Sequence, residues 1–208
     1  MARRGSQAMK KARAWEAGHD VGERRDAIMR GLNTVLRARG RPGALRMQDV
    51  ADHLGLVKGN LYYYFRSKEE LIYHAHVKCV QVSLEALKRA AASKARPAER
   101  LRTLIAEHIL AMTEGEYGAV LLEDIENLTP AHRRKYVALR DEFEKGVRDL
   151  IKAGIAQGDF AKQDVRTAGF AILGAINWIP KWYRPDGELT AHAIAERFAD
   201  MFVRALRA

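Results

Sequence analysis

The chain has a single cysteine, Cys79, among its 208 residues, so no disulfide can form within it. A lone cysteine favours a reducing compartment. Long hydrophobic runs are also lacking: the longest, residues 169–180, is too short to span a bilayer and contains Asn177. The first residues carry charge without an apolar core, so we expect no secretory signal. Together these absences predict a cytoplasmic protein with no membrane association.

Motifs of catalysis and metal binding are missing too. None of the seven histidines belongs to an HxxxH or HExxH pattern, Cys79 has no CxxC partner, and there is no GxSxG or glycine-rich phosphate loop. His74 and His76 are two residues apart, which places them on different faces of a helix. We therefore expect no enzyme, no metal site and no resident cofactor.

Acidic residues are outnumbered, and the imbalance is concentrated at one end. The chain has 36 Lys and Arg against 26 Asp and Glu. Residues 1–70 contain 15 of the cations and 8 of the anions, whereas the other 138 residues contain 21 and 18. An excess of cations attracts a polyanion, because phosphate neutralisation supplies most non-specific DNA affinity. A basic surface that serves only solubility is the alternative.

Residues 47–70, MQDVADHLGLVKGNLYYYFRSKEE, contain two short helices separated by a glycine. The first is amphipathic, because four apolar residues recur at helical spacing: Met47, Val50, Ala51 and Leu54. Gly55 is suited to cap it, and a second helix of barely two turns is expected over residues 60–65. Ser67, followed by Glu69 and Glu70, predicts the start of a longer helix. This is the spacing of a helix-turn-helix, whose second helix lies in the major groove of DNA.

The run LVKGNLYYYFRSKEEL, residues 56–71, resembles the signature of the tetracycline-repressor (TetR/AcrR) family of bacterial transcription regulators. Its Lys-Gly-x-Leu-Tyr-x-x-Phe core, its Ser-Lys-Glu exit and the upstream pair Val50-Ala51 stand at the spacing of that family. By motif the resemblance covers the first third of the chain, and the remainder agrees in length and helix pattern. Two positions depart from it: Val57 and Arg46 replace Ser or Thr helix caps. Arg46 can still meet a phosphate by its charge, whereas Val57 cannot.

Side-chain chemistry and the resemblance point to the same DNA contacts. Lys58 suits a guanine or a phosphate, and Gly59 lets the backbone approach the groove. Tyr62 and Tyr63 can pack on thymine methyl groups or reach phosphates, while Tyr64 either completes the core or touches phosphate. The candidate DNA-binding residues are Arg46, Gln48, Lys58, Gly59, Asn60, Tyr62, Tyr63, Tyr64 and Lys68.

Helical periodicity continues to the end of the chain, without strand patterns or internal repeats. We expect an all-α fold of about nine helices with a basic flexible arm over residues 1–20, a helix-turn-helix domain over 21–66 and a ligand-binding and dimerisation domain over 67–208. The arm either adds DNA contacts or is a solvated tail without a role. Four helix starts are expected from capping residues: Pro97, Thr129-Pro130, Asp164 and Thr190.

The helix expected over residues 165–179 is apolar nearly all round and is expected to end at Pro180. The last helix carries an apolar stripe formed by Ile194, Phe198, Met201, Phe202 and Ala205. A helix with no polar face must be covered on two sides, so we expect these two helices to form a four-helix interface in a homodimer. Members of the family that the chain resembles dimerise in the same way.

Three segments of the body, residues 140–144, 153–160 and 176–190, resemble a TetR-type subgroup that senses coenzyme A thioesters and controls catabolic genes for fatty acids, sterol fragments or aromatic acids. An acyl-CoA effector would need an apolar slot for its acyl part and cations for its phosphates. The candidate ligand-binding residues are His108, Met112, Arg140, Phe143, Phe170, Trp178, Lys181 and Arg184. A neutral hydrophobic drug or metabolite is the rival effector.

The sequence therefore predicts a ligand-responsive repressor that binds a palindromic operator in double-stranded DNA as a homodimer. We expect the small-molecule effector to tilt the helix over residues 67–93. The helix-turn-helix domains of the two subunits would then no longer fit successive major grooves roughly 34 Å apart. The alternative is a basic architectural protein that coats DNA without an effector. Sequence preference and a cavity in the body would separate the two.

Overall fold

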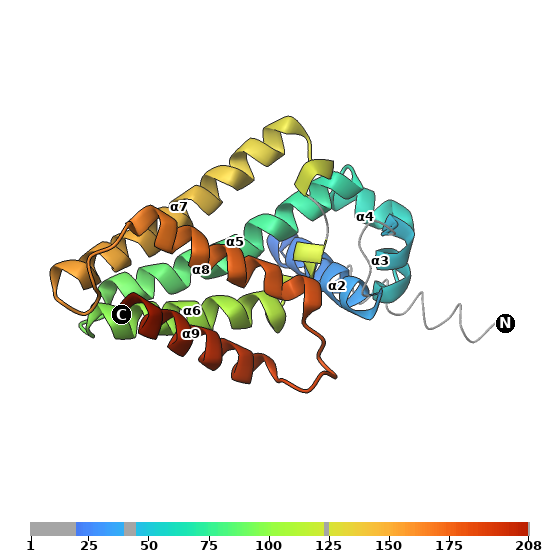
Figure 1. Cartoon of the computed structure of the whole chain (residues 1–208). Coiled ribbons are helices and arrows are strands. Elements are labelled where there is room, and N and C mark those ends of the chain that lie inside the picture. The colour runs from blue at the N-terminus through green and yellow to red at the C-terminus, as the bar shows by residue number, and fades with distance from the viewer. Residues whose placement is uncertain (1–19, 40–44, 123–124, 208) are drawn as a thin grey trace. The chain divides into compact units, whose positions relative to one another are not determined.

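A computed structural model describes residues 20–39, 45–122 and 125–207, and all regular structure in these ranges is helical (Figure 1). The expected all-α fold is confirmed. The arm predicted over residues 1–20, apart from Asp20, lies outside the described residues, as do residues 40–44. The chain forms two compact units: residues up to His76 together with 119–133, and residues 77–118 together with 134–208.

The first unit contains the helix-turn-helix. Helix α2 (Val21–Arg39) packs on α3 (Met47–Leu54) and α4 (Lys58–Tyr64), which also contact each other. Gly55 ends α3 in the left-handed conformation, with φ of 69°, as the sequence predicted. Helix α4 begins two residues earlier than expected. The side chains of Leu61 and Phe65 have no exposed surface and hold the inner side of α4 in the core.

A segment distant in sequence completes the first unit. Two short 3-10 helices, η1 (Gly118–Leu122) and η2 (Ile125–Asn127), belong to it. The backbone N–H of Ala119 donates a buried hydrogen bond of 2.7 Å to Oδ1 of Asn33 in α2. The ring of His132 stacks on Tyr73 with centroids 4.0 Å apart. Residues 119–133 are therefore held by α2 and by α5 (Lys68–Ala92), which begins in this unit and ends in the second.

In the second unit, α6 (Pro97–Thr113) packs on α8 (Val165–Trp182) and α9 (Ala191–Arg207), and α7 (Pro130–Ala156) contributes Phe143 and Val147 to the core. The capping residues act as expected. Pro97 occupies the first position of α6, Asp164 accepts a hydrogen bond from the Thr167 N–H at 2.6 Å, and Thr190 accepts one from the Ala193 N–H at 3.1 Å. Local capping chemistry thus fixes where these helices start.

The expected end of α8 is wrong. Pro180 lies inside the helix, which continues to Trp182, and the N–H of Tyr183 still bonds to the carbonyl of Ile179 at 2.8 Å. Proline removes one N–H donor, and so close to the end of a helix that loss leaves the final turn intact. Buried Pro180 and Ile179 then keep this last turn packed on the core.

The apolar residues of α9 are divided between two sides. The inner side packs on α6 and α8 and consists of Ala191, Ile194, Ala195, Ala199, Val203 and Leu206. Of the stripe expected from the sequence, only Ile194 belongs to this inner side. Met201 remains 44% exposed, and Phe198 and Phe202 are half-buried. Helix α9 therefore presents a second apolar side that its own unit does not cover.

A polar cluster interrupts the core of the second unit. The buried hydroxyl of Ser83 in α5 lies 2.8 Å from Nδ1 of His108 in α6. Asn177 of α8 also interacts with the His108 ring, whose centroid is 4.5 Å from that of Phe143 in α7. Burial lowers the pKa of His108 to about 4, since a charged imidazole is poorly solvated there. The ring is therefore neutral near pH 7.

This burial predicts loss of stability in acid. Below about pH 6.5 the unfolded chain takes up a proton at residue 108, whereas the folded chain does so only near pH 4. Between pH 7 and pH 5 this residue should lower the free energy of unfolding by about 2 kcal/mol, at about 1.4 kcal/mol per pKa unit. Urea unfolding of the parent and of His108→Gln at both pH values measures the effect. The variant should lose about 2 kcal/mol less than the parent, and equal losses would contradict the assignment.

Candidate functional site

The outer side of α4 carries exposed side chains that can contact DNA. Tyr62 is 42% exposed and Tyr63 is 78% exposed, and Lys58 and Gly59 are exposed beside them. The ammonium group of Lys58 lies 5.6 Å from the centroid of the Tyr62 ring. The side thus combines a cation with two aromatic hydroxyl groups, which suit phosphates and the edges of bases.

Gly59 has no role in packing within the described residues. A Cβ atom built at this position would meet nothing within 4 Å. Glycine inside a helix costs about 0.5–1 kcal/mol relative to alanine, so its presence here weakens an already short helix. Open space in front of Gly59 agrees with the interpretation that the α4 backbone approaches a partner closely.

Tyr64 differs from its two neighbours. Its side chain is 7% exposed, and its hydroxyl accepts a hydrogen bond of 2.9 Å from Nη1 of Arg24. The Tyr63 ring meets it edge-on, with centroids 5.0 Å apart. Of the two roles considered for Tyr64, its burial favours completing the core over touching phosphate.

The other candidate DNA contacts lie around α4. Arg46 precedes α3 with a side chain that is 76% exposed, and its bond to Asp49 raises the pKa of the guanidinium. Gln48 donates to Oδ1 of Asp52 at 2.7 Å, which pre-orients its amide. Asn60 is half-buried, as is Lys68 at the start of α5. Val57 provides no side-chain cap to α4.

The candidate ligand-binding residues separate into two groups. His108, Met112 and Phe143 are buried in the core of the second unit, and the charge of exposed Arg140 acts on His108. The others are exposed on α8 or after it: Phe170, Trp178, Lys181 and Arg184. His108 of the first group bonds to Ser83 and interacts with Asn177, and neither of these two residues was among the sequence candidates. Each is a polar residue within an apolar stretch, and that is the signal by which they could have been found.

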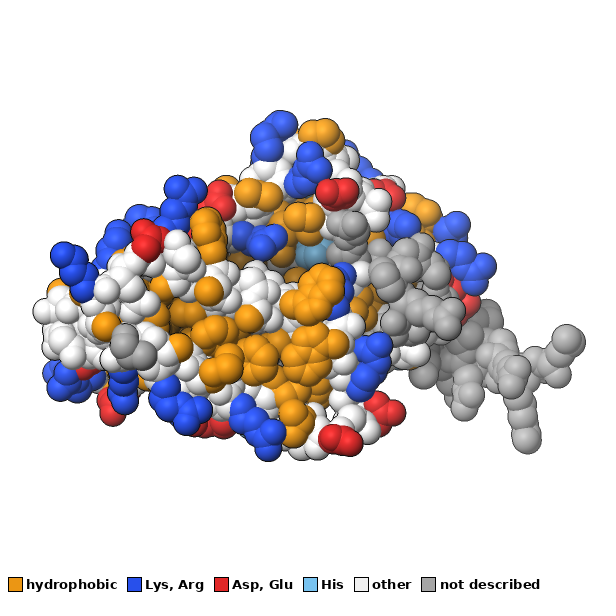
Figure 2. All heavy atoms as spheres, in the orientation of Figure 1, with side chains coloured by type: hydrophobic (Ala, Val, Ile, Leu, Met, Phe, Trp, Pro, Cys, Tyr) orange, Lys and Arg blue, Asp and Glu red, His pale blue; other side chains and the backbone are white. Residues whose placement is uncertain are grey.

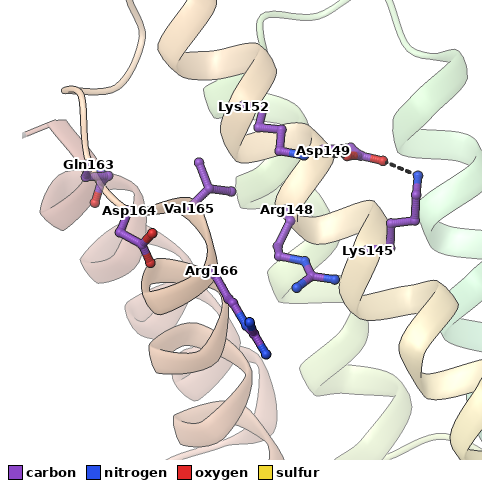
Figure 3. Close-up of a pocket in the computed structure, with 8 residues that line it drawn as sticks. All are labelled: Lys145, Arg148, Asp149, Lys152, Gln163, Asp164, Val165 and Arg166. Atoms are coloured by element: carbon purple, nitrogen blue, oxygen red, sulfur yellow. Dashed lines mark hydrogen bonds and ion pairs between the residues drawn. The ribbon is translucent and has the colours of Figure 1, made fainter.

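A basic groove lies between α7 and the start of α8. Figure 3 shows Arg148 and Arg166 reaching into the space between the two helices, with Lys145 and Lys152 on α7. The groove encloses about 570 Å³. Asp149 partly neutralises it, since this carboxylate lies 2.8 Å from the Lys145 ammonium and 3.6 Å from that of Lys152. None of the residues that line this groove was a candidate from the sequence.

An apolar patch covers the outer sides of α8 and α9 (Figure 2). Its exposed members are Phe170, Trp178, Trp182 and Met201, with Trp178 64% exposed. Phe198 of α9 contacts α8, because its ring centroid lies 6.4 Å from that of Trp182. Within α9, the Phe198 centroid lies 6.0 Å from that of Phe202. Contiguous exposed aromatic surface of this kind marks a protein or ligand contact.

Two other structural features are absent from residues 20–39, 45–122 and 125–207. No helix in these ranges is long and apolar enough to cross a membrane. The same ranges contain no group of three His, Cys, Asp or Glu side chains arranged to hold a metal ion.

Comparison with protein families gives two matches. Residues 36–75 match the model of bacterial regulatory proteins of the tetR family. Residues 94–206, more than half of the chain, match the C-terminal domain of tetracyclin-repressor-like proteins. The first match contains α3 and α4, and the second contains His108, Asn177 and the apolar patch.

Individual relatives agree with these matches. The HTH-type transcriptional repressor KstR2 of Mycobacterium tuberculosis is 25% identical over 181 residues, which cover 86% of this chain and 90% of the relative. The structure of PfmR, a TetR family transcriptional regulator from Thermus thermophilus, matches with 33% identity and a TM-score of 0.77 over 85% of this chain and 97% of PfmR. The structure of AibR in complex with isovaleryl coenzyme A and operator DNA matches with 28% identity and a TM-score of 0.73 over 88% and 98%. The chain belongs to the TetR family of bacterial transcription regulators.

Proposed function

We propose that this protein is a homodimeric transcriptional repressor that binds a palindromic operator through α4 and is released by a small apolar effector. The observation that carries the proposal is the two-sided character of α4. Leu61 and Phe65 are fully buried, whereas Tyr62 and Tyr63 on the other side have no core to cover. A repressor of transcription acts where the DNA is, so the proposal includes a cytoplasmic location.

Release would follow from differential binding. Helix α5 is continuous over 25 residues, so a tilt at its effector-binding end changes the direction in which its first turn holds α4. Residues 119–133 give a second route, since they join α6 to α7 along the chain and are tied to α2 through Asn33. An effector would bind the conformation with one tilt of α5 more tightly than the conformation with the other. The resulting loss of operator binding free energy cannot exceed this difference in effector binding free energy.

An architectural DNA-coating protein is the alternative function. It needs the basic first unit but has no use for a buried polar cluster in the second unit. Buried His108 lies against apolar Phe143 and bonds to buried Ser83, while Asn177, which is exposed, also interacts with the His108 ring. A few polar groups that orient a mainly apolar molecule are typical of ligand sites. This cluster favours a repressor that responds to an effector. A family of regulators also argues against an enzyme.

The DNA-binding side of α4 is tested by substitution. Tyr62→Ala or Lys58→Ala should weaken operator binding by about 1–3 kcal/mol, because each removes a contact to bases or backbone, while weak non-specific binding changes little. Fluorescence anisotropy at fixed salt measures this on a duplex that the parent protein selects from a randomised palindromic pool. Lys88→Ala is the matched control, because Lys88 is exposed on the distant half of α5. Parent-like binding by both variants would show that α4 does not read the operator.

The proposed homodimer would use the apolar patch of α8 and α9. Four large side chains remain exposed there, and a second copy of the same patch would cover them by two-fold symmetry. An interface core rich in Trp, Phe and Met is typical of stable dimers.

Charge placed in this patch should separate the subunits. Trp178→Asp should weaken dimerisation by about 2 kcal/mol or more, roughly 30-fold, because buried tryptophans are frequent interface hot spots. Sedimentation of the DNA-free protein at micromolar concentration measures the association. Val82→Asp is the control, since Val82 is 40% exposed on α5 and lies outside the patch. The interface assignment would be rejected by a monomeric parent, or by two variants that dissociate equally.

For the effector, we propose an acyl-CoA thioester. The buried group of His108, Met112 and Phe143 offers surroundings for an acyl chain. Two sets of cations are available for the phosphates. One is Arg140 on α7 with Lys181 and Arg184 at and after the end of α8, and the other is the basic groove beside Arg166. AibR, a relative of known structure, binds isovaleryl coenzyme A, which supports this ligand class.

A thioester should release the protein from DNA. In a panel that includes isovaleryl-CoA, at least one thioester should displace the dimer from the selected duplex, whereas free coenzyme A and the free acid should act weakly. Arg140→Ala or Arg184→Ala should raise the concentration needed for release, because each charge-assisted phosphate bond contributes about 1.5–3 kcal/mol. Operator affinity without effector should be unchanged.

A double variant of the basic groove, Lys152→Ala with Arg166→Ala, serves as the comparison. If only this variant shifts release, the phosphates bind in the groove instead. If the free acid releases DNA as well as the thioester does, the effector is a smaller apolar molecule and the coenzyme A proposal fails.

A further inference from the structure

Helix α4 lacks the features that stabilise an isolated helix. It is only seven residues long, its N-terminal end has no side-chain cap, and it contains glycine and three consecutive tyrosines. Helices shorter than about 12–15 residues are marginal in water even with favourable sequences. Something outside α4 must therefore hold the side chains that would contact DNA.

The C-terminal end of α4 is held by Arg25 of α2. Nη1 of Arg25 donates a hydrogen bond of 2.6 Å to the carbonyl oxygen of Tyr64, the last residue of the helix. The same guanidinium lies 4.2 Å from the centroid of the buried Phe65 ring. A cation at this point also complements the negative end of the helix dipole.

Arg25 reaches the next helix as well. Its Nη2 lies 3.9 Å from Oε1 of Glu70 in the first turn of α5, and the other Glu70 oxygen accepts a bond of 2.8 Å from the Arg66 N–H. One guanidinium therefore meets the last carbonyl of α4, the ring that follows it and the first turn of α5. Only a flat, multidentate cation can serve three such groups at once.

Arg24 adds a second contact to the same residue. Its Nη1 donates to the Tyr64 hydroxyl at 2.9 Å, so neighbouring arginines of α2 hold the backbone and the side chain of Tyr64. Both contacts come from α2, which also packs on α3. The orientation of α4 is therefore fixed by its contacts with α2 as well as by α3 and the turn that follows it.

We propose that Arg25 is the positioning residue of the recognition helix: it sets the angle of α4 and joins it to α5 without touching DNA, with Arg24 in a supporting role. This inference rests on the proposed function, in which α4 contacts DNA, and it assigns to Arg25 the orientation of α4 that this contact requires. The competing role is a direct phosphate contact, which a basic residue next to the DNA-binding side would also suit. The side chain is 27% exposed, so exposure alone does not decide between the two roles.

Amide hydrogen exchange tests the positioning role without any DNA. Arg25→Ala should speed exchange at the amides of residues 62–65 at least ten-fold, because the α4 end opens more often, while α3 amides change less than three-fold. Arg30→Ala is the matched control, since Arg30 is an exposed arginine of the same helix. Circular dichroism checks that each variant is folded, and Arg25→Lys provides the same test if Arg25→Ala is not. Unchanged exchange in α4 would overturn the inference.

Binding to the selected duplex separates positioning from phosphate contact. Arg25→Ala should weaken this binding at least ten-fold, with the slope of log affinity against log salt unchanged. Arg25→Lys should recover less than half of the loss on a logarithmic scale, because a point charge cannot bridge three groups. A slope lowered by about one, with Arg25→Lys like the parent, would assign Arg25 to a phosphate and overturn positioning. If Tyr62→Ala and Lys58→Ala leave binding unchanged, the proposed function fails, and the exchange result still decides the role of Arg25.

Discussion

A helix of seven residues cannot hold its own shape in water, and much of the first unit is arranged around that constraint. Leu61 and Phe65 anchor the inner side of α4 in the core, and Arg24 and Arg25 of α2 hold its C-terminal end through hydrogen bonds to Tyr64. Because these supports are all on the inner side, the outer side is available for the proposed contact with DNA. Its weak helix formers are tolerated because tertiary contacts, and not propensity, stabilise it.

The second unit solves the opposite problem, since it has more apolar surface than it can bury. Helix α8 packs one side on α6 and α9 and leaves Phe170 and Trp178 outside. Helix α9 is divided in the same way, with Ala199 inside and Met201 outside. A monomer with this surface would be prone to association, and the proposed symmetric partner would cover the excess by using one patch twice.

Features set by neighbouring residues could be predicted from the sequence. The turn at Gly55, the caps at Asp164 and Thr190 and the start at Pro97 are local, and the structure has each of them where the sequence indicated. The family could be recognised because its motif is a continuous run around α4. The helix end expected at Pro180 failed because burial of the last turn, a tertiary effect, outweighed a local rule.

Contacts between distant residues could not be predicted in the same way. Nothing in the spacing of α2 reveals that Arg25 meets a carbonyl 39 residues later. Met112 and Phe143 were expected to lie together with Phe170 and Trp178, yet the first pair is buried and the second exposed. Helical periodicity shows which residues share a side of one helix, but it does not show which neighbour that side meets.

The tie between Asn33 and Ala119 bears on how the chain is made. On a ribosome, the helix-turn-helix emerges first, but the backbone amide that bonds to Asn33 follows 86 residues later. Closing so long a loop slows the completion of the first unit, since contacts of high sequence separation form late in folding. A fragment that ends after α4 would also lack residues 119–133, which belong to the same compact unit. The DNA-binding unit is therefore not a detachable N-terminal module, and its native form requires the chain to have passed through α6.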